Sequence, residues 1–292
     1  MKLARFHTGD GDVRVGRVDG DQVVDLSGVE GVGTSVREIL PDLPKLKQAI
    51  EAADGTRHPL ASVALLAPID DPQKYLGIGM NYKEHAEEAR QAGIPTPTSQ
   101  LWFNKQVSCI NDPLGDIVKP DVSDELDYEI ELAVVIGQRC KHVAAENARS
   151  VIAGYMVAND VSVRDWLVKR SPTFTLGKSF DTHGPMGPWL VTPDEIGDPH
   201  ALELRTWVNG EMRQHSNTKQ LIFDCFAQVE HLSTAFTLEP GDVITTGTPA
   251  GVGGAMKPPR FLVAGDVVRI EIERIGTLEN RVVPEPEDSA LL

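Results

Sequence analysis

The stretch Glu125-Leu-Asp-Tyr-Glu-Ile-Glu-Leu-Ala-Val-Val-Ile-Gly137 organises the rest of the chain. Charged and apolar residues alternate along its first half, after which it is purely apolar and ends at a glycine. This pattern indicates a strand that enters the core. Because successive side chains of a strand point to opposite faces, Glu129 and Glu131 project from the same face, with Cα atoms about 6–7 Å apart. Two carboxylates held this close repel each other and resist desolvation, so something must compensate them.

Two interpretations of this acidic strand face are open at this point. A hard divalent cation, which takes oxygen ligands, would neutralise the two carboxylates. Alternatively, the strand lies at the edge of a sheet, where a solvated acidic face prevents pairing with another sheet edge. The alternation of residues supports both interpretations equally.

Composition limits the class of protein. The chain has 292 residues, of which 41% are hydrophobic, with 26 glycines and 20 prolines, and these values favour a strand-rich globular protein. The 43 acidic and 28 basic residues give a net charge of −15, which disfavours nucleic-acid and membrane partners because phosphate backbones and anionic lipids are repelled. The three cysteines form no Cys-x-x-Cys pair. No apolar run has the length of a signal or membrane segment, so we expect a cytoplasmic protein.

The chain divides into three parts. We expect a small N-terminal α+β lobe over residues 1–70, which contains an Asp19-Gly20 hairpin turn and a helical pattern over residues 35–53. Residues 71–284 are predicted to form a strand-dominated α+β catalytic domain. Residues 285–292 are rich in proline and glutamate, and we expect this tail to fray.

A short helix is predicted between Asn81, as its N-cap, and Gly93, where the pattern stops. His85 and Glu88 lie three residues apart and are therefore neighbours on one helix face. The carboxylate could orient the imidazole and stabilise its charge. A solvated surface pair is the alternative interpretation.

Two more charged residues accompany the acidic strand. Asp160 ends the apolar stretch that begins at Gly154, and Lys178 lies in a loop that begins with a glycine. With Glu129 and Glu131, Asp160 completes a set of three carboxylates, which is the ligand type that Mg²⁺ or Mn²⁺ prefers. Asp160 and Lys178 also have alternative interpretations, since Asp160 could cap the next turn and Lys178 could be a surface lysine.

The glycine-rich segments do not match nucleotide-binding motifs. Gly177-Lys-Ser179 lacks the glycine that a phosphate-binding loop needs five residues earlier, where the chain has Pro172. Gly77-Ile-Gly79 lacks its third glycine, because that position is Tyr82. The run over residues 247–254 is predicted to be a flexible loop whose backbone amides could hold a carboxylate.

Five motifs in a fixed order resemble the fumarylacetoacetate hydrolase superfamily, and the resemblance covers residues 74–283. They are Gly-x-Asn-Tyr-x-x-His at 79–85, Asp-Tyr-Glu-x-Glu-Leu at 127–132, Gly-Tyr-x-x-x-Asn-Asp-x-x-x-Arg at 154–164, Gly-Lys-x-x-Asp at 177–181, and Gly-Asp-x-Ile-x-Thr-Gly-Thr-Pro-x-Gly-Val-Gly at 241–253. The resemblance implies a mixed β-sandwich roll with a small N-terminal lobe, and a homodimer.

The resemblance also implies roles for individual residues. It implies that Glu129, Glu131 and Asp160 bind Mg²⁺ or Mn²⁺. The remaining implied residues are a water-activating pair on a lid over residues 82–95 (His85, Glu88), an active-site lysine (Lys178), and residues near a small anionic keto-acid substrate (Arg164, Lys105, Tyr82, Thr248).

The reaction expected from this resemblance is hydrolysis of a carbon–carbon bond in a 2,4-diketo acid of the acylpyruvate type. His85 would deprotonate a water, and the metal and Lys178 would stabilise the pyruvate enolate that leaves. An oxaloacetate decarboxylase or a 2-hydroxyhepta-2,4-diene-1,7-dioate isomerase on the same metal site is the alternative. Leu167 departs from acylpyruvase-like members, where a polar residue is expected, and leaves a larger sugar-derived or aromatic-catabolic diketo acid open as substrate.

Overall fold

A computed structural model describes the chain except for residues 10, 92, 94, 96, 171–172 and 288–292. Two large sheets dominate the described residues, and they confirm the strand-dominated α+β fold with mixed strand pairing. Most of the tail predicted to fray lies outside the described residues. No helix in the described part is long and apolar enough to span a membrane.

The larger sheet has twelve strands in the described residues. In spatial order its main path is β4 (Arg57–Pro59), β3 (Gln22–Asp25), β2 (Arg14–Asp19), β1 (Lys2–His7), β14 (Gly184–Val191), β12 (Ile152–Asn159), β11 (Ile130–Ile136), β17 (Val243–Thr245), β6 (Tyr75–Gly79) and β7 (Leu101–Lys105). Off this path, β5 (Ala64–Leu66) pairs with β1 and β8 (Ile110–Asn111) pairs with β14.

The second sheet packs on the first to form a sandwich. Its order is β16 (Glu211–Asn217), β15 (Glu203–Val208), β18 (Val267–Ile272), β19 (Gly276–Pro284) and β9 (Ile117–Lys119). A two-stranded sheet joins β10 (Leu126–Asp127) to β13 (Ser162–Val163). The turn between β15 and β16 is Asn209-Gly210, and both residues have the positive φ that a tight hairpin requires.

Helices are few and lie outside the sheets. The α-helices are α1 (Val36–Ile39), α2 (Leu43–Ala52), α3 (Lys83–Gln91), α4 (Pro193–Ile196) and α5 (Cys225–Ala235). The 3₁₀ segments are η1 (Leu40–Asp42), η2 (Leu60–Ser62), η3 (Val107–Cys109), η4 (Ala145–Val151), η6 (Thr218–Gln220) and η7 (Gly253–Ala255), and η5 (Trp166–Arg170) is a π-helical turn.

Asn81 does not cap α3 as predicted. Its side-chain amide instead donates to the carbonyls of Phe223 and Thr246, and its oxygen accepts from the amide of Phe223. Because Asn81 is fully buried, satisfying its own polar atoms takes precedence over capping.

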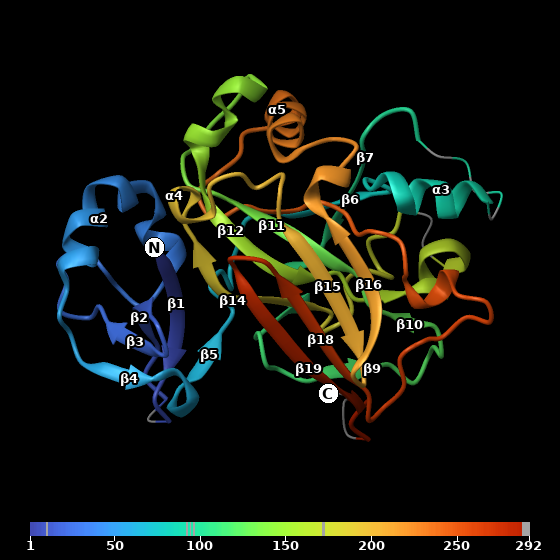
Figure 1. Ribbon diagram of the computed structural model, residues 1–292, viewed down its shortest axis with the longest axis horizontal. Coiled ribbons are helices and arrows are strands. Elements are labelled where there is room, and N and C mark those ends of the chain that lie inside the picture. Colours follow the sequence, from blue (N-terminus) through green and yellow to red (C-terminus); the bar gives the residue numbers. More distant parts are fainter. Residues whose placement is uncertain (10, 92, 94, 96, 171–172, 288–292) are drawn as a thin grey trace.

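Strand β11 lies in the interior of the larger sheet, between β12 and β17, and its two faces enter different cores (Figure 1). Leu132 and Val134 alternate with Ala133 and Val135, and all four are fully buried. Leu132 and Val134 belong to the core between the sheets, and Ala133 and Val135 to the core covered by the N-terminal lobe. A solvated edge strand is therefore excluded for this stretch.

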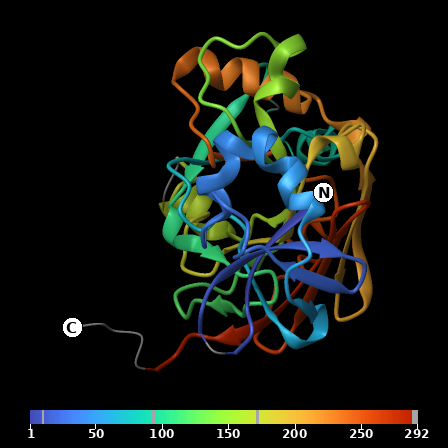
Figure 2. The same ribbon diagram turned by 90° about the vertical axis from the view of Figure 1, so that its left-hand side faces the viewer.

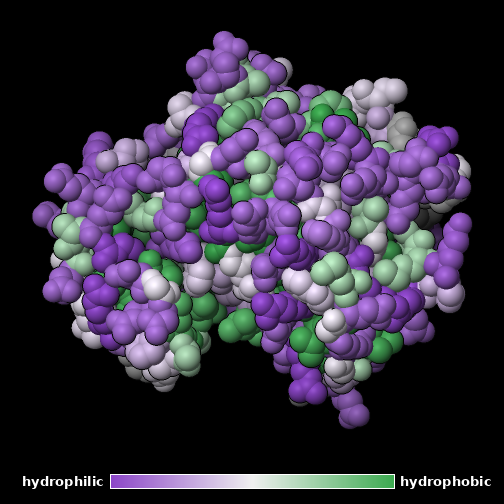
Figure 3. Space-filling model, in the orientation of Figure 1, coloured by the Kyte–Doolittle hydropathy of each residue, from purple (hydrophilic) through white to green (hydrophobic). Residues whose placement is uncertain are grey.

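The N-terminal lobe continues the larger sheet. Strand β1 pairs antiparallel with β14, with Leu3 opposite Leu190, so the strands of the lobe extend the sheet of the catalytic part. Figure 2 views the molecule from the side of this lobe. Figure 3 shows a largely hydrophilic face, with hydrophobic residues gathered in the hollow between the lobe and the rest. Buried residues of both parts belong to one hydrophobic core. The boundary between a lobe over residues 1–70 and a domain over residues 71–284 therefore remains a prediction.

Candidate metal centre and the cavity beside it

Three buried carboxylates meet where β11 begins and β12 ends. Among the described residues, Glu129, Glu131 and Asp160 form a group whose oxygens lie within 4.8 Å of one another. Strand pairing brings them together, because the amide of Asp160 donates to the carbonyl of Glu129 at 2.9 Å and Glu131 lies opposite Ala158. The β11 segment contributes Glu129 and Glu131, and its pairing with β12 brings Asp160 beside them as the third carboxylate.

Basic side chains surround this acidic group. The Nζ atom of Lys178 lies 2.7 Å from Glu129 Oε2 and 2.7 Å from Asp160 Oδ2. Arg164 Nη1 lies 2.6 Å from Glu129 Oε1, and Lys105 Nζ lies 2.6 Å from Asp160 Oδ1. Two of the three carboxylates thus have cationic partners within contact distance.

Glu131 lacks such a partner among the described residues, and it accepts only the backbone amide of Gly247, at 2.7 Å. Burial, and then repulsion from Asp160 and Glu129, raise the pKa of Glu131 well above its usual range. Burial would also raise the pKa of Glu129, but Lys178 and Arg164 outweigh it and lower that pKa to about 2. Glu131 is therefore the carboxylate of this group that no described cationic side chain contacts.

This donor set fits a hard divalent cation. Three carboxylate oxygens are the ligands that Mg²⁺ and Mn²⁺ prefer, and a cation would relieve the repulsion that raises the pKa of Glu131. Glu129, Glu131 and Asp160 would hold it.

Metal affinity is expected to increase with pH. Because the pKa of Glu131 is raised in the metal-free protein, its carboxyl keeps a proton at pH values where other carboxyls have lost theirs, and a metal must displace that proton. Titration of the EDTA-treated protein with Mn²⁺ at about pH 5 and about pH 8 should show weaker binding and greater proton release at the lower pH. An affinity that is independent of pH would contradict the raised pKa.

A cavity of about 540 Å³ opens beside the carboxylates. Its lining includes six of the residues singled out from the sequence: His85, Glu88, Glu129, Arg164, Lys178 and Thr248. His85 Nδ1 lies 2.9 Å from Glu88 Oε2, as their spacing on α3 predicted, and both side chains are partly buried. The pair therefore faces a cavity and is not a solvated helix face.

Lys105 and Tyr82 are not placed where a substrate contact was predicted. Neither lines the cavity. The Lys105 ammonium is buried between Asp160 and the carbonyl of His183, which accepts from Nζ at 3.0 Å. Tyr82 is fully buried and belongs to the core between the sheets. Lys105 holds a carboxylate in position and Tyr82 fills the core.

Asp127 belongs to the same acidic stretch but not to the group of three carboxylates. It is fully buried, and its oxygens accept the amides of Gly253 and Gly254, each at 2.8 Å, and Arg164 Nε at 2.8 Å. It therefore fixes both the glycine-rich loop and the arginine that faces the cavity. The sequence did predict that amides of this loop could hold a carboxylate, and the carboxylates are those of the protein itself, Asp127 and Glu131.

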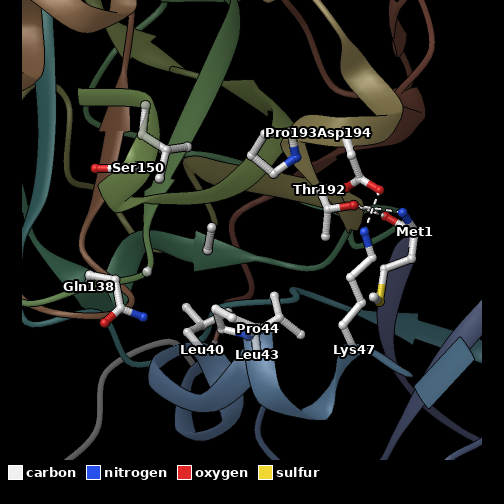
Figure 4. Close-up of a pocket in the computed structure, with 13 residues that line it drawn as sticks. Met1, Leu40, Leu43, Pro44, Lys47, Gln138, Ser150, Thr192, Pro193 and Asp194 are labelled. Carbon is white, nitrogen blue, oxygen red and sulfur yellow. Dashed lines mark hydrogen bonds and ion pairs between the residues drawn. The ribbon is translucent and has the colours of Figure 1, made fainter. Parts of the chain in front are cut away.

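A smaller cavity of about 220 Å³ lies between the N-terminal lobe and the catalytic part (Figure 4). Leu40, Leu43 and Pro44 form its apolar side. Lys47 reaches across it to Asp194, and their charged atoms are 2.7 Å apart. This ion pair links the N-terminal lobe to the catalytic part. Because the two charges neutralise each other, the described lining of this cavity does not offer a buried carboxylate without a cationic partner, as the acidic centre does.

Family models match nearly the whole chain. Residues 74–283 match the model described as fumarylacetoacetate (FAA) hydrolase C-terminal. The chain belongs to the fumarylacetoacetate hydrolase family. Residues 1–68 match the model described as Rv2993c-like, N-terminal, so the N-terminal part also has counterparts in known proteins.

Curated relatives of this family member are similar along most of their length. The chain is 44% identical over 291 residues to "Oxaloacetate tautomerase fahd2, mitochondrial" of Xenopus laevis, covering 97% of this chain and 90% of the relative. It is 46% identical over 258 residues to "Oxaloacetate tautomerase FAHD2B, mitochondrial" of Homo sapiens, covering 83% and 81%.

Solved structures of the family share the fold. A putative HpcE protein from Mycobacterium smegmatis has a TM-score of 0.88 at 35% identity, covering 98% of this chain and 100% of that chain. Maleylpyruvate hydrolase from Sphingobium sp. SYK-6, in complex with manganese(II) and pyruvate, has a TM-score of 0.84 at 34% identity with the same coverage.

The prediction of a cytoplasmic protein is contradicted by these comparisons, because curated relatives from Xenopus laevis, Homo sapiens and Bos taurus are labelled mitochondrial. The prediction depended on the lack of apolar segments. Such segments bear on secretion and membrane insertion, and they do not address import into an organelle.

Proposed function

We propose that this chain is a divalent-metal-dependent enzyme that interconverts the keto and enol forms of a 2-oxo acid, with oxaloacetate as the first candidate substrate. The observation that carries the proposal is the Lys178 ammonium, held 2.7 Å from two buried carboxylates at the cavity wall. The names of the curated relatives support oxaloacetate, and the manganese and pyruvate bound to a structural neighbour support the metal and the substrate class. Mg²⁺ is the other candidate metal.

A bound divalent cation would stabilise the negative charge that develops on the 2-oxo oxygen when the enolate forms. Lys178 would add a second positive charge near that oxygen and exchange a proton with it. Arg164 lines the same cavity, and its guanidinium would provide a positive charge for a substrate carboxylate.

His85 is the proposed base that removes the proton from C3 of the substrate. The contact of Nδ1 with Glu88 leaves Nε2 to take the proton, and the carboxylate stabilises the imidazolium that results. The reaction breaks one C–H bond and forms one O–H bond, so it needs no co-reactant.

Carbon–carbon hydrolysis of a 2,4-diketo acid is the second candidate. The His85–Glu88 pair favours it, because the same imidazole could deprotonate a water that attacks the distal carbonyl. The maleylpyruvate hydrolase among the structural neighbours supports this alternative. A homodimer that acts on a small anionic keto acid remains a prediction for either reaction.

Product analysis separates the reactions. With Mn²⁺ or Mg²⁺, a tautomerase should accelerate the decay of enol-oxaloacetate absorbance and release neither CO₂ nor a second carbon fragment. A decarboxylase should release CO₂, and a hydrolase should convert an acylpyruvate to pyruvate and a carboxylic acid. No acceleration of enol-oxaloacetate decay in metal-loaded protein would refute the proposed function.

His85→Gln is expected to lower kcat by about 10²- to 10⁴-fold, because it removes the proposed base. Metal affinity should stay close to that of the wild type, since His85 is not among the three proposed ligands. Glu87→Gln is the matched control, because Glu87 lies on the same helix with its carboxylate paired to Arg90. If both variants retained full turnover, a catalytic role for α3 would have to be abandoned.

A further inference from the structure

The cavity beside the carboxylates has two chemically different parts. On one side are Glu129, Lys178 and Arg164, which are linked by ion pairs. Much of the remaining lining is apolar and comes from segments far apart in the sequence, including Met80, Leu101, Phe103, Leu167, Phe174 and Phe261. A cavity of about 540 Å³ falls in the range of about 300–1,000 Å³ that suits ligands larger than a four-carbon acid.

The apolar part of the cavity lining contains aromatic side chains close to Lys178. Lys178 Nζ lies 5.2 Å from the centroid of the Phe103 ring, and Phe174 contacts Phe103 edge to face, with centroids 6.2 Å apart. A Cβ atom on Gly77 would lie 2.5 Å from Phe103 Cζ, so the glycine leaves the space that this ring occupies. These contacts therefore fix the position of the Phe103 ring in the cavity wall.

The charges of the lining do not favour a second substrate carboxylate far from the metal centre. Lys178 and Arg164 are both paired with Glu129, and Lys169 lies 3.4 Å from Glu125. Asp165 adds a further acidic side chain to the lining. Of the described cationic groups in the cavity, only Arg164 Nη2 is an unpartnered buried nitrogen, and Arg164 lies beside Glu129.

We propose that the apolar part of the cavity, which includes Phe103, Phe174 and Phe261, is a subsite for a hydrocarbon substituent of ring size on the 2-oxo acid. Phenylpyruvate is the simplest such ligand. This inference rests on the proposed function for the binding of the 2-oxo acid group. The aromatic ring would lie against Phe103, Phe174 and Phe261, and the carboxylate and 2-oxo oxygen would lie at the metal centre. The same proton transfer from C3 to the 2-oxo oxygen would interconvert the keto and enol forms of phenylpyruvate.

Titration calorimetry on the full, Mn²⁺-loaded chain tests the subsite with pyruvate and phenylpyruvate, which share one head group. Burial of the ring should make phenylpyruvate bind about 10- to 100-fold more tightly. In Phe174→Ala and in Phe261→Ala, the ratio of the two dissociation constants should fall at least about threefold. Val263→Ala is the control, because Val263 is exposed and outside the cavity, and it should keep the wild-type ratio.

The outcomes separate this inference from the proposed function. Equal affinity for the two ligands, or a preference that survives both phenylalanine substitutions, overturns the subsite even if oxaloacetate is tautomerised. A preference that both substitutions reduce, in a protein that tautomerises neither ligand nor oxaloacetate, supports the subsite and refutes the proposed function. Two separate positions are used so that misfolding of one variant, detected by circular dichroism, does not remove the test.

Discussion

Glu131→Gln is expected to abolish metal-dependent turnover while leaving the metal-free protein at least as stable as the wild type. The glutamine keeps the size of the side chain and an oxygen that can accept the Gly247 amide, but it removes one of three anionic ligands. We expect the affinity for Mn²⁺ to fall by more than about 100-fold. The value of kcat/KM should fall by about 10³-fold or more, because the charge that stabilises the enolate is lost.

The stability part of this prediction follows from the pKa of Glu131. Its pKa is raised in the folded protein, so the folded state binds more protons than the unfolded state above the ordinary pKa of a glutamate. In the metal-free wild type, stability is therefore lost as the pH rises through that window. A neutral glutamine does not ionise and avoids this loss.

Thermal unfolding in EDTA and in Mn²⁺ measures both effects. The wild type should gain stability from Mn²⁺, because a ligand that binds only the folded state raises the unfolding temperature, and Glu131→Gln should not. Glu146→Gln removes the same charge from an exposed position in η4 and should behave as the wild type does. A Glu131→Gln protein that still gained stability from Mn²⁺ would refute Glu131 as a ligand.

Strand alternation predicted the part of this centre that is local in sequence. It placed Glu129 and Glu131 on one face, and the helical spacing placed His85 beside Glu88, as the contact at 2.9 Å bears out. It could not place Asp160 beside them, because that contact depends on which strands pair. Asp160 was a candidate because it ends a second apolar stretch, and the family resemblance implied the same three ligands. The pairing of β11 with β12 gives the physical cause of their contact.

Burial gives two residues contacts that the sequence does not reveal. Lys105 has the charge of a substrate-binding residue, but its ammonium is fully buried against Asp160. Asp127 belongs to the same acidic stretch as Glu129, yet it holds the amides of Gly253 and Gly254, about 126 positions away. Long-range contacts of this kind leave no periodic signal in the sequence. The continuity of the N-terminal lobe with the main sheet, through β1 and β14, is another such contact.

Lys178→Met is expected to strengthen metal binding and lower turnover, whereas Glu131→Gln is expected to lower both. In the metal-free protein the Lys178 ammonium occupies the space between Glu129 and Asp160, at 2.7 Å from each. Burial would lower the pKa of Lys178, but Asp160 and Glu129 outweigh it and raise that pKa, so the side chain carries its charge. A fixed ammonium competes with a metal for the same two carboxylates.

Removal of this charge should therefore strengthen Mn²⁺ binding while it lowers kcat by about 10²- to 10³-fold, the cost of losing one group that stabilises a developing oxyanion. The metal-free variant should also be less stable than the wild type, because two buried carboxylates lose a cationic partner, and Mn²⁺ should restore more stability to it than to the wild type. Calorimetry with Mn²⁺, thermal unfolding in EDTA and the rate of enol-oxaloacetate decay measure the three effects.

Lys169→Met is the matched control for Lys178→Met. Lys169 also lines the cavity, but its side chain is 69% exposed and its partner Glu125 is not a proposed ligand, so Mn²⁺ affinity should not increase. Turnover that is unchanged in Lys178→Met would eliminate the lysine from the mechanism. Weaker metal binding in that variant would show that Lys178 supports the carboxylates in their ligand positions and does not compete with the metal.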